Sequence, residues 1–168
     1  MKKTWVFLSV LIVVAVLLAG CAEQAPTSTL DKIKQAGKVV VGTSADYPPY
    51  EYVDEAGNFT GFDIELMTEI AKRMGVDLEW VDMPFDSLIP ALLSKKIDLI
   101  AAGMSATAER AKKVAFSTPY EISMSAFLVK ADNDSLKTLA DLKGKSVAAQ
   151  LGTVQETFAK TIEGVTVK

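Results

Sequence analysis

Three short apolar runs separated by helical patterns constrain the fold of this chain more than any other feature. Lys38–Gly42 is a continuous apolar run closed by glycine, which is typical of a strand buried on both faces. Val76–Trp80 alternates apolar and polar residues, and Ile97–Ala101 is short, largely apolar and ends in small residues. Apolar residues recur at helical spacing in both intervals between these runs, so the order is strand, helix, strand, helix, strand. That order favours parallel pairing and an α/β layer.

The two intervening helices have recognisable ends. Apolar residues recur at helical spacing from Ile64 to Met74, with Asp63 placed to cap the start and Gly75 to end the helix. The second helix runs over Pro84–Ser94, and Pro90 is compatible with it only in the first turn. Two helices are therefore expected between the three strands.

Loops at the carboxyl ends of such strands are the places where folds of this kind bind ligands. Three loops qualify, at residues 43–50, 82–86 and 102–110. The first belongs to the stretch TSADYPPYEY, which carries three aromatic residues and two prolines. Prolines stiffen a loop and so lower the cost of holding an aromatic ring against a ligand.

The third loop contains the strongest candidate for a charged binding group. Thr107 fits an N-cap, because its hydroxyl can accept a hydrogen bond from an N–H of the first turn. Arg110 follows in that turn, where a cation is unfavourable, and such breaks of a local rule mark functional sites. A guanidinium beside exposed N–H groups and the Ser105 hydroxyl predicts a pocket for a carboxylate. The alternative is a solvated surface arginine.

The pattern changes after residue 120. Ile122–Lys130 predicts one long strand that crosses out of the first lobe. A short helix, a strand, a helix and the start of another strand are expected over Leu136–Gly144, Ser146–Gln150, Val154–Ile162 and Val165–Lys168. These elements cannot close a core, so we expect an N-terminal fragment with lobe 1 over 38–120 and a hinge strand with a partial lobe 2 over 121–168.

Residues 1–20 have the pattern of a secretory signal rather than of a folded element. Lys2 and Lys3 precede an apolar run that is too short for an ordinary membrane-spanning helix. The sequence LAGC that follows looks like a lipoprotein cleavage site, after which Cys21 carries the lipid; a plain cleavage site with an incidental cysteine is the alternative. Residues 21–37 are then expected to be the lipidated cysteine and a polar tether.

Charge and residue content exclude several functions. The chain has a net charge of −3, and residues 1–20 hold two lysines and no acid, so the mature part carries −5. Basic residues are not clustered, so nucleic acid is not an expected partner. The absence of histidine excludes a histidine general base, and with one cysteine it leaves no zinc site. We expect no metal and no cofactor.

Four segments, taken in order, resemble the polar-amino-acid (family three) extracellular solute-binding proteins of ABC importers. They are VGTSADYPPYEY, GFDIELMTEIAKRMG, FDSLIPALLSKKIDLIAAGMSATAERAKKVAFSTPY and LKGKSVAAQLGT, and the match as a whole runs from about Val39 to Phe158. The resemblance implies a periplasmic-binding-protein-like type II fold, in which two α/β lobes joined by a hinge close on an amino acid. Here the second lobe is expected to be incomplete.

The resemblance also implies roles for the polar residues. Arg110 matches the arginine that pairs with the ligand α-carboxylate. Gly103 and Ser105 match positions that offer a backbone carbonyl and a hydroxyl to the α-amino and carboxylate groups. Gln150 and Thr153 match contacts from the second lobe, where Thr153 helps to hold the carboxylate.

The same resemblance implies aromatic walls and a specificity position. Tyr47 and Phe85 match the rings that flank the ligand side chain. Ser44 stands where many members carry an aspartate, so a cationic side chain lacks one expected partner. Structural roles are the alternatives: Phe85 in the core, Tyr47 as a loop staple and Gln150 at a solvent-facing strand end. The sequence does not name the amino acid.

The implied function is the substrate-binding component of an ABC importer, which captures an amino acid in the cleft between the lobes and delivers it to the membrane permease. The resemblance implies a monomer, not an enzyme, anchored outside the bacterial cell membrane through Cys21. Two alternatives stay open. One is an amino-acid-sensing domain of a receptor. The other is an enzyme resembling cyclohexadienyl dehydratase, for which Asp46 is the only cleft-side candidate acid.

Overall fold

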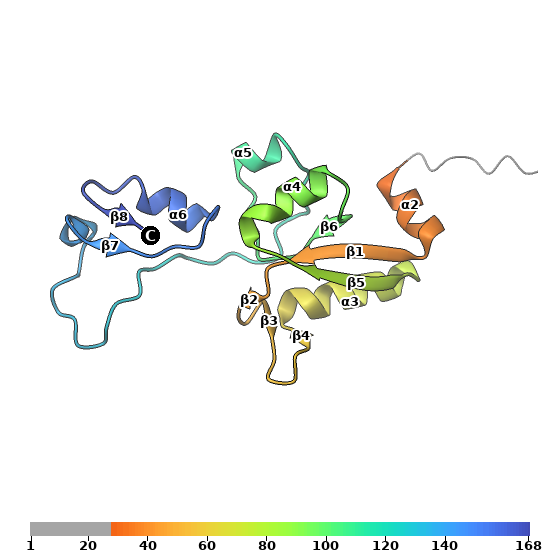
Figure 1. Cartoon of the computed structure of the whole chain (residues 1–168), viewed down its shortest axis with the longest axis horizontal. Coiled ribbons are helices and arrows are strands. Elements are labelled where there is room, and N and C mark those ends of the chain that lie inside the picture. Colours follow the sequence, from red (N-terminus) through yellow and green to blue (C-terminus); the bar gives the residue numbers. More distant parts are fainter. Residues whose placement is uncertain (1–27) are drawn as a thin grey trace, which may run out of the picture.

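The computed structural model describes residues 28–168, which form two lobes joined by an extended segment (Figure 1). Residues 28–120 build the larger lobe and residues 131–168 the smaller one; residues 121–130 are the linking segment. The expected signal, Cys21 and the start of the tether lie outside the described residues. Between residues 28 and 168, no helix is long and apolar enough to cross a membrane.

A parallel sheet forms the centre of the larger lobe, as the sequence predicts. Its strands are β1 (Lys38–Thr43), β5 (Asp77–Asp82) and β6 (Leu99–Ile100), in the order β5-β1-β6. β1 pairs with β5 along its whole length, from Lys38 opposite Asp77 to Thr43 opposite Asp82. β6 is shorter than the predicted strand at 97–101, because only Leu99 and Ile100 stand opposite residues of β1.

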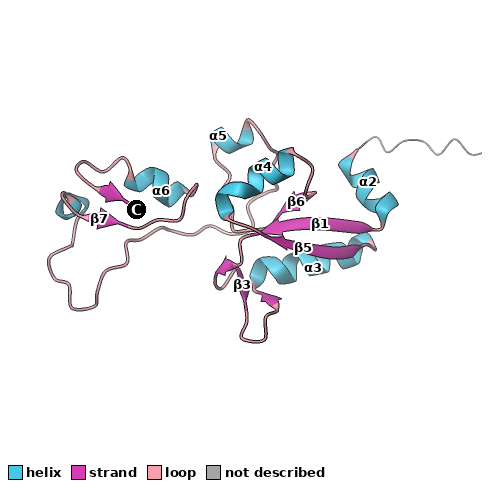
Figure 2. Ribbon diagram, viewed as in Figure 1, coloured by secondary structure: helices cyan, strands magenta, loops and turns pink. Residues whose placement is uncertain are grey.

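Helices cover both faces of this sheet (Figure 2). The helices of the larger lobe are α2 (Thr29–Ala36), α3 (Phe62–Met74), α4 (Leu88–Leu93) and α5 (Ala108–Ala111). One core joins α2 and α3 to β1, and consists of Ile33, Val39, Val41, Met67, Ala71 and Ala101. The other lies under α4, and consists of Leu88, Ala91, Ile97 and Ala102. The predicted second helix is a 3-10 turn, Phe85–Ser87, followed by α4, with Pro90 in the first turn of α4 as expected.

The larger lobe begins earlier than the sequence interpretation places it. Residues 29–36, expected to belong to a tether over 21–37, form α2. Ser28 and Asp31 build a capping box, in which the Ser28 hydroxyl accepts from the Asp31 N–H and the Asp31 carboxylate from the Ser28 N–H, each at 3.1 Å. Ile33 is buried in the core. The tether prediction is wrong over these residues, because one buried side chain and a good cap suffice to dock a short polar helix.

Asp63 does not cap α3, contrary to the sequence prediction. Gly61 occupies the N-cap position, and Asp63 lies inside the first turn. Asp63 is fully buried, and its Oδ2 accepts hydrogen bonds from the Gly103 N–H and the Tyr120 hydroxyl, each at 2.8 Å. The carboxylate therefore braces the loop after β6 instead of its own helix.

A small antiparallel sheet that the sequence pattern did not predict begins in the first loop and continues beyond it. Its strands are β2 (Asp46–Tyr47), β3 (Glu51–Val53) and β4 (Phe59–Thr60), in the order β2-β3-β4. A turn between Val53 and Phe59 joins β3 to β4, and Asp54 Oδ1 accepts from the Asn58 N–H at 2.8 Å. Strands of two or three residues are too short for periodicity to reveal them.

The smaller lobe has a two-stranded parallel sheet and two short helical segments. They are η2 (Leu139–Leu142), β7 (Ser146–Val147), α6 (Val154–Ala159) and β8 (Thr166–Val167), each shorter than predicted. The predicted strand over 122–130 is wrong as a strand, because those residues pair with no other strand in the described part of the chain. Ile122, Met124 and Leu128 are accordingly more than nine-tenths exposed, at 92%, 97% and 99%.

Candidate ligand-binding site

A cavity of about 530 Å³ lies where the two lobes and the linking segment meet. All three predicted loops contribute to its wall, with Asp46 and Tyr47 from the first, Phe85 from the second, and Ala102, Gly103, Ser105 and Arg110 from the third. The smaller lobe adds residues 148–150 and 153–155, and the linking segment adds residues 123–126. The carboxyl ends of the parallel strands therefore face the cavity, as expected for an α/β layer.

Arg110 lies in the first turn of α5 and lines the cavity. Thr107 caps this turn as predicted, because its hydroxyl accepts from the Arg110 N–H at 3.2 Å. The guanidinium donates to the carbonyl oxygens of Ser105 and Gly152 at 2.7 and 2.9 Å, and lies 5.4 Å from the centre of the Phe85 ring. Desolvation lowers the pKa of Arg110, but a guanidinium remains charged at neutral pH. A guanidinium has several further N–H groups, so Arg110 can also hold a carboxylate.

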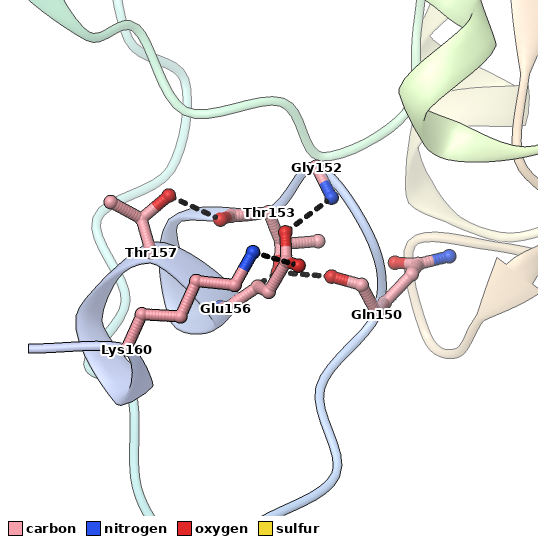
Figure 3. Close-up of polar contacts among 6 residues, drawn as sticks. All are labelled: Gln150, Gly152, Thr153, Glu156, Thr157 and Lys160. Atoms are coloured by element: carbon pink, nitrogen blue, oxygen red, sulfur yellow. Dashed lines mark hydrogen bonds and ion pairs between the residues drawn. The ribbon is translucent and has the colours of Figure 1, made fainter. Parts of the chain in front are cut away.

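The turn before α6 brings the smaller lobe to the cavity (Figure 3). The Thr153 hydroxyl accepts from the Glu156 N–H at 3.1 Å and donates to the Gln150 carbonyl at 2.7 Å. The Glu156 carboxylate accepts from Lys160 Nζ at 2.6 Å and from the Gly152 N–H at 2.8 Å. These bonds lower the pKa of Glu156, so the group that orders the turn is ionised at neutral pH.

Gln150 connects the two lobes from the same turn. Its Nε2 lies 2.9 Å from Asp46 Oδ2, 3.2 Å from Asp46 Oδ1 and 3.5 Å from Ser44 Oγ. Ser44 is buried, and its hydroxyl also lies 3.3 Å from Asp46 Oδ1. Ser44 is not among the residues of the cavity wall, so the structure gives it a supporting position behind Gln150 and Asp46 rather than the expected ligand contact.

Two aromatic side chains, Tyr47 and Phe85, line the cavity. Tyr47 is 45% exposed and stacks on Tyr50 with 5.2 Å between ring centres. Gly103 lies against the same ring, since a Cβ added there would be 3.3 Å from two Tyr47 ring atoms. Phe85 faces the Arg110 guanidinium. Exposed ring faces of this kind can flank an aliphatic or cationic side chain.

Two carboxyl groups on the cavity wall were not predicted as ligand contacts: Asp46 and Glu51. Glu51 is 1% exposed, and its Oε2 has no hydrogen-bond partner among the described residues. Burial raises the pKa of Glu51 to about 8, with further contributions from the charges of Asp63 and Asp46. Glu51 is therefore largely protonated at pH 7. An acid inside a polar, aromatic loop carries no sequence signal of burial, which explains why it was missed.

Seven of the eight residues predicted to bind ligand line the cavity: Tyr47, Phe85, Gly103, Ser105, Arg110, Gln150 and Thr153. The eighth is Ser44. Within residues 28–168, no three carboxylate, thiol or imidazole groups are grouped as a metal ion requires.

The chain has two lobes of mixed α/β structure around a cavity that contains one guanidinium and two acids. This arrangement defines the class of the protein: it has the two-lobed type II periplasmic binding fold, with a partial second lobe. The chain belongs to the bacterial extracellular solute-binding proteins, family 3, whose sequence model matches residues 39–166.

Similar proteins agree with that class. The chain is 48% identical over 128 residues to a probable histidine-binding protein of Campylobacter jejuni, covering 76% of this chain and 50% of that protein. It is 41% identical over 160 residues to the arginine-binding extracellular protein ArtP of Bacillus subtilis, covering 95% and 60%. The crystal structure of an ancestral amino-acid-binding protein, a precursor of cyclohexadienyl dehydratase, matches with a TM-score of 0.78 at 45% identity, over 84% of this chain and 64% of that one. The chain thus spans between 50% and 60% of the length of these two curated relatives.

Proposed function

We propose that this chain captures an amino acid with a cationic side chain as the substrate-binding component of an ABC importer. The lobes close on the ligand and deliver it to the permease subunits in the membrane. The protein acts as a monomer outside the cytoplasm, anchored through lipidated Cys21. The names of the relatives, which refer to binding of histidine and arginine, support this ligand class.

One observation carries the proposal: the charges on the cavity wall complement those of a basic amino acid. The acidic and basic side chains among the described residues of that wall are Arg110, Asp46 and Glu51. A basic amino acid offers a carboxylate to the guanidinium and a cationic side chain to the two acids. A neutral side chain would leave Glu51 protonated and form no ion pair with it, whereas a cationic side chain pairs with the ionised carboxylate.

The ligand α-carboxylate is assigned to Arg110, with help from the Ser105 hydroxyl on the same wall. The Thr153 hydroxyl donates its hydrogen to the Gln150 carbonyl at 2.7 Å, so it can help to hold the carboxylate only when that bond is released. A half-buried guanidinium forms charge-assisted bonds that offset the desolvation of a carboxylate. The carbonyl of Gly103 is assigned to the ligand α-amino group, as the family resemblance implies.

The cationic side chain is assigned to Glu51, between the rings of Tyr47 and Phe85. Glu51 thereby supplies the carboxylate that an aspartate at position 44 supplies in many family members, since this chain has Ser44 at that position. Its Oε2 is buried without a partner, and a cation beside it would favour the ionised form. Asp46 adds a second carboxylate, which Gln150 already contacts at 2.9 Å.

Binding without catalysis is part of the proposal. Asp46, the candidate general acid, is held by the Gln150 amide from the opposite lobe. The similar proteins named above are described as binding proteins, and this supports the same role here.

Thermal unfolding of the full chain with single amino acids tests the proposal. L-Arginine at about a hundred times its Kd should add about 2.7 kcal/mol of stability, which amounts to several degrees in Tm. L-Citrulline, which has nearly the same shape without the charge, should give a much smaller shift. Arg110→Ala should abolish the arginine shift. The control Arg73→Ala removes an arginine whose side chain is 77% exposed on α3 and should leave the shift unchanged.

Two results would contradict the proposal at different levels. Equal Tm shifts with L-arginine and L-citrulline would refute the role of Glu51 in recognising the positive charge of the ligand side chain. No shift with any basic, neutral or acidic amino acid would refute amino-acid binding itself.

A further inference from the structure

We propose that Gly152 sets how closely the two lobes approach each other, and that it thereby positions Arg110 and the smaller lobe around the ligand. Gly152 belongs to the turn before α6, at the point where the smaller lobe touches the larger one (Figure 3).

The fit between Gly152 and the larger lobe leaves no room for a side chain. A Cβ added at Gly152 would lie 2.9 Å from the Cβ and 3.2 Å from the Cα of Asp86. Both are atoms at or beside the backbone of the 3-10 turn Phe85–Ser87, not the end of a flexible side chain. Packed backbone cannot yield cheaply, so a larger residue must push the lobes apart.

The backbone of Gly152 is hydrogen-bonded on both sides. Its carbonyl accepts from Arg110 Nη2 of the larger lobe at 2.9 Å. Its N–H donates to Glu156 of the smaller lobe at 2.8 Å, and Lys160 holds the same carboxylate at 2.6 Å. The peptide of Gly152 is thus fixed within its own lobe and presents its carbonyl to the other.

Separation of the lobes would break the hydrogen bonds between them. Arg110 would lose the Gly152 carbonyl, and Gln150 would lose the Asp46 carboxylate. A close approach at Gly152 therefore favours the closed arrangement before any ligand arrives. The apparent affinity for a ligand falls in proportion to the fraction of molecules that are in the binding-competent arrangement.

The distance between the lobes provides a test that needs no ligand. Cys21→Ala removes the one native thiol, and nitroxide labels go on Lys72→Cys and Asp134→Cys, exposed positions in the two lobes. Double electron–electron resonance on the full chain should show a longer and broader distance distribution for Gly152→Ala. Gly144→Ala is the matched control: its φ of +77° is close to the +80° of Gly152, but an added Cβ meets nothing within 4 Å.

A second variant separates steric contact from backbone strain. Gly152→Asn keeps the added Cβ, and asparagine adopts positive φ more readily than alanine. The distribution should lengthen for Gly152→Asn and stay unchanged for Gly144→Asn. An unchanged distribution in both Gly152 variants, or an equal change in the Gly144 controls, would overturn the proposal.

The affinity for L-arginine gives a further readout, which rests on the proposed function. Gly152→Ala should weaken binding about tenfold, as expected if the competent fraction falls by that factor, and Gly144→Ala should leave the affinity unchanged. Equal affinities for Gly152→Ala and Gly144→Ala would contradict the positioning role. If no variant and not even the unchanged chain bound L-arginine, the proposed function would fail, while the distance measurement would still decide the role of Gly152.

Discussion

The carboxylate of Asp63 accepts a hydrogen bond from the hydroxyl of Tyr120 at 2.8 Å, which joins the first turn of α3 to the residue where the chain leaves the larger lobe. The same oxygen accepts from the Gly103 N–H at 2.8 Å. One fully buried carboxylate thus holds both a loop of the cavity and the root of the linking segment. Burial and the bond to Asp63 raise the pKa of Tyr120, so the phenol keeps its proton.

Asp63→Ala should lower the free energy of unfolding by about 2–4 kcal/mol, because two hydrogen bonds to its buried side chain are lost and their donors are left unpaired. Tyr120→Phe removes one of these bonds and keeps the ring stacked on Phe62 at 5.8 Å. The loss of unfolding free energy in Tyr120→Phe should be smaller, about 1–2 kcal/mol. Urea unfolding followed by circular dichroism measures both. If both variants lost the same unfolding free energy, the hydrogen bond from the Gly103 N–H to Asp63 would contribute nothing to stability.

Long-period features of the fold could be predicted from the sequence. Val39–Gly42 in β1 is a continuous apolar run, and the spacing from Ile64 to Met74 predicted α3 up to its last residue, Met74. The three loops that line the cavity followed from the order of strands alone, because parallel strands bring their carboxyl ends to one edge. Arg110 could be found because a cation in a first helical turn conflicts with local electrostatics.

Features that depend on tertiary contacts could not be predicted. α2 was missed because only Ile33 of that helix is buried. Glu51 lies on β3 opposite Tyr47, and only the pairing of those short strands shows that the acid points into the protein. The segment over 122–130 has the composition of a strand, but pairing is decided by a partner elsewhere in the chain, and the described residues supply none.

Glu51 should make the ligand-free protein less stable as the pH rises. Its pKa of about 8 in the folded state exceeds the ordinary value of 4.5, so the folded chain binds more protons than the unfolded chain between these values. Its stabilising contribution is complete below pH 4.5 and is lost as the pH rises through 8. From pH 6 to pH 8 the loss should be about 2 kcal/mol.

Urea unfolding at several pH values checks this loss, with Glu51→Gln as the comparison. The pKa is lowered in three other acids, Asp54, Asp141 and Glu156. Their contributions to the free energy of unfolding are therefore complete by pH 6 and do not change between pH 6 and pH 8. Glu51→Gln should remove the decline. A decline that persists in Glu51→Gln would assign it to other groups.

Binding of L-arginine should strengthen over the same pH range in which stability falls. A cationic ligand needs ionised Glu51, so binding must release the proton that burial keeps on the carboxyl. The affinity should rise about twentyfold from pH 6 to pH 7.5, because the ionised fraction rises by that factor. Isothermal titration calorimetry in buffers of different ionisation enthalpy counts the released proton directly. Proton release that is unchanged in Glu51→Gln would show that another group is responsible.

Arg110→Lys tests whether the planar fork of the guanidinium is needed or a positive charge alone suffices. The guanidinium donates to two carbonyls, at 2.7 and 2.9 Å, while lying over Phe85, and an ammonium group cannot keep this geometry and also face a carboxylate. The affinity for L-arginine should fall about ten- to a hundredfold, a loss of about 1.4–2.7 kcal/mol. Arg73→Lys, at an exposed site paired with Glu69, is the matched control and should bind as the unchanged chain does. Calorimetric titration of both variants measures these affinities. If Arg110→Lys binds L-arginine as tightly as Arg73→Lys does, a positive charge alone is enough to hold the ligand. The hydrogen bond from Arg110 to the Gly152 carbonyl then has no part in ligand binding.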